Sequence, residues 1–269
     1  MTDLESPPPL GRRRLLSALG TAAIVVACSA GLFVAGLAKG VIPPSIFWRS
    51  RDLYQDPVMV RLANAVAAGD VRQIDALVAQ GADVNSKGRD GYGLLMWAMA
   101  KRSPQGFARL LDHGADPLAP ARDMPANARA GMKMPFIAEY AARATSPAFL
   151  QALLERGLDP NLTRANGTPL LFQAIESHAQ WNVEALLDAG ADVNRSSPDN
   201  VESPLQVALA IDQWEIAQCL VDRGADPTQK DRWGYSPIDD ITDPKRGYTA
   251  TQRVLRDKLI ADLKRRGHL

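Results

Sequence analysis

Apolar residues recur along most of the chain at intervals of three and four, which is the spacing of one face of an α-helix. Five of these apolar runs are followed by a glycine a few residues later. The runs are Ile74-Leu77-Val78, Phe107-Leu110-Leu111, Phe149-Leu153-Leu154, Val183-Leu186-Leu187 and Ile216-Leu220-Val221. Glycine readily adopts the left-handed conformation that ends many helices. The pattern therefore predicts a series of short amphipathic helices, each ended by a glycine.

These glycines open a phrase that repeats. Gly81 and Gly190 begin Gly-Ala-Asp-Val-Asn, Gly114 and Gly224 begin Gly-Ala-Asp-Pro, and Gly157 begins Gly-Leu-Asp-Pro-Asn. The steps between successive glycines are 33, 43, 33 and 34 residues. The aspartate two places after each glycine is expected to accept a hydrogen bond from the backbone of the turn. A period of this size indicates a repeat array, in which each unit buries its apolar face only against its neighbours.

Short polar motifs indicate where the helices begin. A serine or threonine N-cap followed by proline at the first helical position is a start signal with a clear mechanism. First helices are predicted to start at Thr168-Pro169, Ser203-Pro204 and Ser236-Pro237, and second helices at Asp70, Ser103-Pro104 and Ser146-Pro147. Each unit is therefore predicted to consist of a turn, a helix, a short loop and a second helix.

These residues resemble ankyrin repeats, whose signature is a Thr-Pro-Leu-His-like helix start and a Gly-Ala-Asp-like close on a period of about 33 residues. The resemblance implies an all-α repeat solenoid of about six helix-turn-helix units with β-turn or hairpin fingers. The units would span residues 57–88, 89–118, 119–161, 162–195, 196–227 and 228–269. The match is incomplete: Gly93-Leu94 and Met134-Pro135 replace two helix starts, and no unit keeps the family's histidine.

The step of 43 residues places about ten extra residues near 119–131. Pro120, Pro125 and Gly131 argue against a regular element there. By analogy with the family, this insertion lengthens one finger. It either extends the binding face or forms a plain surface loop.

Residues 15–38 form an uncharged segment of 24 residues. It is flanked by Arg12-Arg13-Arg14 on one side and by Lys39 on the other. A helix of that length spans about 36 Å, against about 30 Å of bilayer hydrocarbon. We therefore predict a cytoplasmic tail at 1–14, a transmembrane anchor at 15–38 and a juxtamembrane linker at 39–56. The same pattern also describes an export signal, and the residues before Cys28 resemble a lipoprotein cleavage box.

The three arginines favour a cytoplasmic N-terminus, which places the repeats on the far side of the membrane. The composition has a bacterial style, so we expect a single-pass inner-membrane protein with a periplasmic ankyrin domain. The alternative is secretion to the periplasm after signal cleavage. The two cysteines, Cys28 and Cys219, lie in separate segments. The fold is therefore expected to depend on packing, with Cys219 as a buried inert thiol.

The repeat region is close to neutral. From residue 57 onward lie 25 of the chain's 31 basic residues and 26 of its 30 acidic residues. This balance argues against nucleic acid as a partner. His113, His178 and His268 lack metal-ligand spacing, and no nucleophile motif or phosphate-binding loop is present. We predict a protein without catalytic site, metal or cofactor; the enzyme alternative is a site assembled from Asp239, Asp240 and His178.

The resemblance further implies that the fingertips and the inner helices line a concave surface that binds another protein. Arginine and aromatic residues are frequent anchors of such interfaces. The predicted partner-binding residues are Arg89, Asp90, Tyr92, Arg122, Arg129, Lys133, Arg164, Asn166, Asp199, Asn200, Arg232, Trp233 and Tyr235. Trp233 and Tyr235 could instead cover the core of the last unit.

The predicted function is a membrane-tethered adaptor or scaffold for a partner protein of the same compartment. Three alternatives remain at this stage. The chain could be an immunity protein that neutralises a delivered toxic effector, a stabiliser of an exported enzyme, or a passive structural element of the envelope.

Overall fold

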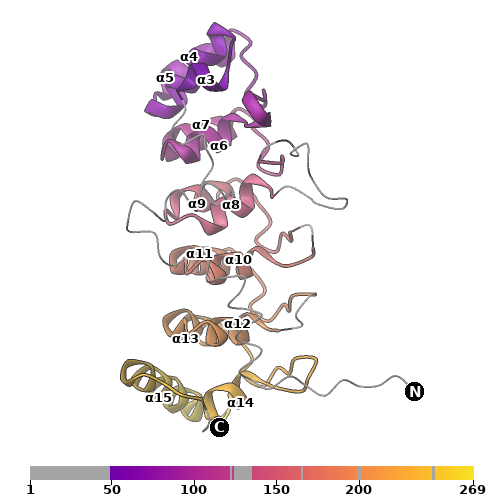
Figure 1. The fold of residues 1–269 in the computed structure, drawn as a ribbon, viewed down its shortest axis with the longest axis vertical. Coiled ribbons are helices and arrows are strands. Elements are labelled where there is room, and N and C mark those ends of the chain that lie inside the picture. Colours follow the sequence, from indigo (N-terminus) through magenta and orange to yellow (C-terminus); the bar gives the residue numbers. More distant parts are fainter. Residues whose placement is uncertain (1–48, 122, 124–134, 165, 199–201, 244–245) are drawn as a thin grey trace, which may run out of the picture. The chain divides into compact units, whose positions relative to one another are not determined.

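The computed structural model describes residues 49–121, 123, 135–164, 166–198, 202–243 and 246–269. Their contacts divide the repeats into an N-terminal block that ends at Asp159 and a C-terminal block that begins at Pro160. Each block is built from helix pairs, labelled in Figure 1. The predicted tail at 1–14 and anchor at 15–38 lie outside the described residues. No helix within the described ranges is both long enough and apolar enough to cross a bilayer.

The N-terminal block contains three helix pairs preceded by one helical turn. Its elements are α3 (Ser50–Leu53), α4 (Pro57–Ala68), α5 (Val71–Ala79), the 3-10 turn η2 (Arg89–Gly91), α6 (Leu94–Ala100), α7 (Pro104–Asp112), α8 (Ile137–Arg143) and α9 (Ala148–Leu154). The first helices of the pairs are α4, α6 and α8. The second helices, α5, α7 and α9, pack in that order and form a second-helix row.

The C-terminal block repeats this arrangement. Its elements are α10 (Leu170–Glu176), α11 (Gln180–Asp188), α12 (Pro204–Ala210), α13 (Trp214–Asp222), α14 (Pro237–Thr242) and α15 (Ala250–Arg265). The first helices α10, α12 and α14 pack in sequence, and so do the second helices α11, α13 and α15. Across the described ranges the extended pairing is limited to isolated bridges at three fingers, Lys87 with Gly93, Pro120 with Phe136 and Thr163 with Pro169. The architecture is therefore the expected all-α repeat solenoid.

Four of the predicted helix starts are confirmed by hydrogen bonds to the capping side chain. Gln73 N donates to Asp70 (3.0 Å), Gly106 N to Ser103 (3.2 Å), Gln206 N to Ser203 (3.2 Å) and Asp239 N to Ser236 (3.4 Å). Each bond satisfies one of the backbone donors that the first turn of a helix leaves without an intrahelical partner.

Two predicted starts are displaced by one residue. Helix α10 begins at Leu170, with Pro169 as its N-cap residue, because the hydroxyl of Thr168 bonds to Ser197 Oγ (3.1 Å) instead of capping the helix. Helix α9 begins at Ala148, and Pro147 precedes it without any side-chain cap.

The closing phrases behave as predicted at the helix ends. Their five glycines have φ between 82° and 95°, which is the left-handed region. The aspartate two places on accepts a backbone hydrogen bond within the turn at four of the phrases. These bonds join Asn85 N to Asp83, Leu118 N to Asp116, Asn194 N to Asp192 and Thr228 N to Asp226, each at 2.8 to 2.9 Å.

An asparagine in three of the phrases also holds the phrase of the next repeat. Asn85 Nδ2 donates to the carbonyl of Gly114 (3.0 Å), and its Oδ1 accepts from Asp116 N (2.9 Å). Asn161 and Asn194 make the same pair of bonds to the phrases at Gly190 and Gly224. We call these paired bonds the asparagine rungs. They satisfy terminal backbone groups and fix the spacing of neighbouring repeats.

The predicted apolar runs form the core. Ile74, Phe107, Leu110, Val183 and Leu220 are completely buried. The rings of Phe107 and Phe149 meet edge to face, with centroids 5.2 Å apart, so they join α7 to α9. Fully burying one such side chain stabilises the fold by about 1.5–3 kcal/mol. Within the runs, Leu111, Leu154 and Leu187 are only half-buried, because a second helix also presents a side to solvent.

The predicted linker at 39–56 extends too far, because its last residues belong to the folded block. Helix α3 packs on α4, and Leu53 and Tyr54 are 3% and 5% exposed. The Tyr54 hydroxyl donates to the carbonyl of Ser86 (2.7 Å), and burial raises the pKa of Tyr54. Residues 49–56 therefore close the apolar end of the first helix pair.

Candidate protein-binding surface

The first described fingertip presents two of the three residues predicted for it. Arg89 and Asp90 are exposed in η2, where Asp90 has φ 55° and Arg89 Nε lies 3.9 Å from Asp90 Oδ2. Tyr92 is only 4% exposed. The prediction that Tyr92 contacts a partner is therefore wrong, because the backbone turns after Gly91 and carries this side chain into the core.

The finger before α10 places Arg164 and Asn166 in one tight turn. The turn is closed by Arg164 N, which donates to the carbonyl of Thr168 (2.8 Å), and by Gly167 N, which donates to the carbonyl of Arg164 (2.8 Å). Asn166 Oδ1 accepts from Thr168 N (3.1 Å). Asn166 is exposed and Arg164 is half-exposed, so part of each residue faces solvent.

The last finger brings Arg232, Trp233 and Tyr235 together around Asp231. Asp231 Oδ1 accepts from the backbone N of Trp233 (2.8 Å) and of Tyr235 (3.1 Å). The guanidinium of Arg232 lies 4.8 Å from the centre of the Trp233 ring. Arg232 is exposed and both aromatic residues are half-buried. Part of each aromatic residue therefore faces solvent.

Five of the predicted residues lie outside the described residues: Arg122, Arg129, Lys133, Asp199 and Asn200. Of the predicted insertion at 119–131, the structure describes residues 119–121 and 123. Ala121 N donates to the carbonyl of Pro135 (3.0 Å), and Asp123 N to the carbonyl of Asp90 (3.1 Å). Asp123 also pairs with Lys87 at 2.8 Å. The insertion therefore begins against the preceding finger.

Residues of α3, α4 and α6 line a hollow of about 590 Å³. Its apolar part comes from Val60 and Ala67 of α4 and from Trp97 of α6. Lys101, at the end of α6, holds its ammonium 4.4 Å from the centre of the Trp97 ring, and burial lowers the pKa of Lys101. The Trp97 indole donates to the carbonyl of Ala63 (2.7 Å), which fixes the ring. We call this site the helix hollow.

A second hollow of about 540 Å³ lies between α3 and the finger. Leu53, Tyr54 and Gly88 line it, together with the exposed Lys87 and Arg89. Arg51 lines both hollows. We call this second site the finger hollow. It places a predicted fingertip residue, Arg89, beside α3.

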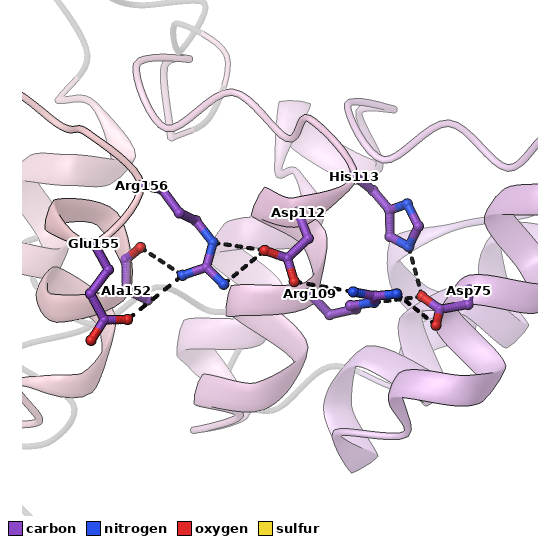
Figure 2. Close-up of polar contacts among 7 residues, drawn as sticks. All are labelled: Asp75, Arg109, Asp112, His113, Ala152, Glu155 and Arg156. Atoms are coloured by element: carbon purple, nitrogen blue, oxygen red, sulfur yellow. Dashed lines mark hydrogen bonds and ion pairs between the residues drawn. The ribbon is translucent and has the colours of Figure 1, made fainter.

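Ion pairs extend along the second-helix row of the N-terminal block (Figure 2). Asp75 accepts from Arg109 Nε (2.5 Å) and Nη2 (2.8 Å), and it lies 2.7 Å from His113 Nε2. Asp112 joins Arg109 (3.3 Å) to Arg156 (2.8 Å). Hydrogen bonds from Arg109 and then His113 lower the pKa of Asp75 to about 2. Burial alone would raise the pKa of Asp112, but hydrogen bonds from Arg156 and Arg109 bring it below its usual value.

The same pairing recurs in the C-terminal block, where Asp188 pairs with Arg223, and Asp222 pairs with Arg266 at 2.5 Å. In each pair, the aspartate lies two positions before one left-handed glycine, Gly190 or Gly224. The arginine lies directly before the next left-handed glycine, Gly224 or Gly267. We call these contacts the charge rungs. The charge rungs connect the ends of successive second helices. Because these charged side chains pair with one another, we interpret them as structural.

The described residues contain no group of three or more His, Cys, Asp or Glu residues placed to hold a metal ion. Asp239, suggested above as part of a catalytic site, accepts from the backbone N and hydroxyl of Ser236 (both 2.7 Å) and so caps α14. His178 lies in the loop after α10 with φ 56°. Cys219 is half-buried, and burial raises the pKa of its thiol, which favours the unreactive protonated form.

The two hollows were not predicted from the sequence. Arg49, Arg51 and Lys101 belong to no motif of the repeat pattern. One signal was present: Val60, Asn64 and Ala67 recur at intervals of four and three on α4 and lie off its buried face. A second, non-core stripe of this kind marks a side of a first helix that the core leaves uncovered.

Comparison with known proteins is consistent with these observations. Residues 138–231 match the family described as ankyrin repeats (3 copies). Protein PhlB of Serratia liquefaciens is 30% identical over 161 residues, which is 59% of this chain and 66% of PhlB. Ankyrin repeat domain-containing protein 40 of Mus musculus is 40% identical over 65 residues, which is 24% of this chain and 18% of that protein. The chain therefore spans less than two thirds of the length of these curated relatives.

Solved structures show the same fold. An ankyrin repeat domain from Acinetobacter baumannii AYE aligns with a TM-score of 0.57 and 22% identity, over 74% of this chain and 96% of that one. The ankyrin repeat domain of Bcl-3, a member of the IkappaB protein family, aligns with a TM-score of 0.55 and 24% identity, over 68% of this chain and 79% of that one. The repeating phrases, the stacked helix pairs and these matches together show that the chain is an ankyrin-repeat protein.

Proposed function

We propose that this protein binds another protein through its fingertips and first helices, and that it acts as an adaptor without catalysis of its own. Ankyrin repeats generally serve as interaction modules, although fold alone names no partner. The observation that carries the proposal is the arrangement around Arg51. This residue lines two hollows, and the fingertip residue Arg89 lines one of them. Exposed arginines near hollows and aromatic side chains are the usual anchors of protein interfaces.

The second-helix row supports the same assignment by contrast. Its charged residues Asp75, Arg109, Asp112 and Arg156 are engaged in ion pairs within the array. At the fingertips, Arg89, Asn166 and Arg232 contact residues of their own fingers and are exposed to solvent. A partner therefore finds recognition groups mainly on the finger side.

We further propose that residues 15–38 hold the protein in the bacterial inner membrane, with the repeats in the periplasm. The support is the uncharged length of this segment and the arginines before it. Alkaline phosphatase fused after residue 269 should be active in intact cells. N-terminal sequencing of the purified chain then distinguishes a retained anchor, which keeps Arg12, from a cleaved signal. An inactive fusion would contradict export by either route.

The binding proposal is tested by crosslinking in living cells, followed by capture of the tagged full chain and mass spectrometry. The test variant combines Arg89→Ala, Arg164→Ala and Arg232→Ala, one substitution at each described fingertip. Tyr92 is left unchanged because it is buried, and its replacement would damage the core. We expect a partner that wild type captures to be lost with this variant, because truncating several interface anchors removes most of the binding energy.

A matched control replaces three exposed charged residues on second helices, Arg72, Arg253 and Lys258, with alanine. This control should retain the partner, and both variants should keep the helical circular dichroism of wild type. If the fingertip variant retains the partner while the control loses it, the binding face has been assigned to the wrong side.

A further inference from the structure

The helix hollow and the finger hollow have a strongly positive lining. Of the eight residues that line the helix hollow, Arg49, Arg51 and Lys101 are basic and none is acidic. Arg51, Lys87 and Arg89 line the finger hollow beside one acidic residue, Asp52, while Lys87 also pairs with Asp123 (2.8 Å) and Arg89 lies 3.9 Å from Asp90. The repeat region as a whole is nearly neutral. The excess of positive charge is therefore greatest in the helix hollow.

The helix hollow combines this charge with apolar surface and a fixed base. Val60 and Ala67 supply aliphatic atoms, and Trp97, only 2% exposed, closes the base through its bond to Ala63. Lys101 lies above that ring, and burial lowers the pKa of its ammonium. A bound anion stabilises a partly desolvated ammonium, since the attraction between opposite charges increases where water is excluded.

The dimensions suit a linear ligand. Each hollow falls within the range of about 300–1,000 Å³ that is typical of ligand sites. Because both hollows share Arg51, one extended segment can place side chains in the two of them together. Carboxylates would meet Arg51 and Lys101, and an apolar side chain would contact Val60 and Ala67. Arginine offers the planar, two-pronged donor geometry that matches a carboxylate.

Two other anionic ligands fit less well. A membrane surface would meet exposed charges such as Arg51 and Arg89, but it would leave the apolar atoms of Val60 and Ala67 within the helix hollow without a contact. Single-stranded nucleic acid needs exposed aromatic faces on which bases stack, and the Trp97 ring is buried beneath Lys101. The mixture of charge and aliphatic surface favours a peptide.

We propose that the helix hollow and the finger hollow together bind an acidic, leucine-like segment of the partner protein. This inference rests on the proposed function and specifies which part of the surface selects the partner and by which chemistry.

The test uses the full chain in a mild non-ionic detergent and a random peptide library displayed on phage. We expect the enriched peptides to combine glutamate or aspartate with aliphatic residues. The best peptide is then measured by fluorescence anisotropy on wild type and on the double variant Arg51→Glu/Lys101→Gln. Binding to this variant should be weaker by about tenfold or more, because an attraction at the centre of the site becomes a repulsion. Raising the salt concentration should weaken binding to wild type as well.

Arg72→Glu is the matched control, because it reverses an exposed charge on α5 that lines neither hollow. It should leave the affinity for the peptide within about twofold. Circular dichroism must be the same for all three proteins. The single variant Arg51→Glu is measured as well. Because Arg51 is exposed, this substitution should leave the fold intact, and the expected loss of affinity is smaller than for the double variant.

Enrichment of neutral or basic peptides, or no enrichment, would overturn the proposal. So would equal affinity for wild type and the double variant. Phosphatidylserine vesicles or oligothymidylate that bind wild type more tightly than the selected peptide, and lose this affinity in the double variant, would assign the hollows to another ligand. If peptides bind but are lost only with the fingertip variant Arg164→Ala/Arg232→Ala, the hollow proposal fails while protein binding by the repeats stands.

Discussion

The asparagine rungs make a prediction about how neighbouring repeats are joined. In the rung at Asn194, Nδ2 donates to the carbonyl of Gly224 (3.2 Å), and Oδ1 accepts from Asp226 N (2.8 Å). Asn194→Ala removes both bonds and leaves the turn at Asp192 in place. The substitution therefore tests the contact between two repeats rather than the folding of one.

The magnitude follows from the two lost bonds. A hydrogen bond within a protein contributes about 0.5–1.5 kcal/mol net, and both groups of this rung can turn to water once the side chain is gone. We expect the free energy of unfolding to fall by about 1–2 kcal/mol. For about 200 ordered residues, this corresponds to a decrease in Tm of about 2–8 °C. In a repeat array, stability is a sum of repeat and interface terms, so the loss should centre on this interface.

Urea unfolding followed by circular dichroism measures the free energy, and hydrogen exchange of the amide of Asp226 reports the rung directly. Leu118→Ala is the matched control. Leu118 occupies the same place in its phrase but is 43% exposed, and its side chain offers no hydrogen bond. We expect the control to change stability by less than about 0.5 kcal/mol. Equal losses for the two variants, or unchanged exchange at Asp226, would refute this account of the rungs.

Three further predictions concern the N-terminal block. Gly106→Ala should lower the free energy of unfolding by about 1–3 kcal/mol although alanine favours helices, because the added Cβ would lie 2.2 Å from the carbonyl oxygen of Val66; thermal unfolding that shows a gain would contradict this. Trp97→Phe should cost about 1–3 kcal/mol in urea unfolding, since the buried carbonyl of Ala63 loses its donor, and an unchanged midpoint would be incompatible with that bond. Folding lowers the pKa of Asp75 from 3.8 to about 2, so its stabilising effect is present above about pH 4 and is lost toward pH 2. The difference in stability between wild type and Asp75→Asn should shrink over that range, and a constant difference would exclude the proposed linkage.

Much of this fold was predictable because each repeat is specified by local residues. A glycine that must adopt positive φ, an aspartate that accepts from its own turn and a serine before a proline all act within a few positions of the sequence. Their outcomes at Gly81, Asp83 and Ser203 follow the prediction. The exception at Thr168 arises from a contact that is not local, because its hydroxyl bonds to Ser197 in the next repeat. A bond between distant positions cannot be read from a local motif.

The binding surface was less predictable for the same reason. Position within a finger does not decide on which side a side chain lies, and so Tyr92 proved to be buried although its neighbours Arg89 and Asp90 are exposed. The hollows bring together Arg51 and Lys101, which are fifty positions apart and belong to no common motif. The rungs also escaped prediction, although the Asp-x-Gly and Arg-Gly pairs that make the charge rungs recur visibly in the sequence.

The central claim is that a partner binds on the side of the fingers and first helices. Site-specific photocrosslinking in living cells tests it most directly, with a photoreactive amino acid placed at Arg89, Asn64, Arg72 or Lys258 in turn. The four side chains are exposed, so each substitution should leave the core unchanged. The account predicts crosslinks to one partner from positions 89 and 64 and none from positions 72 and 258. Crosslinks to that partner only from 72 or 258 would place the interface on the second helices and contradict the account.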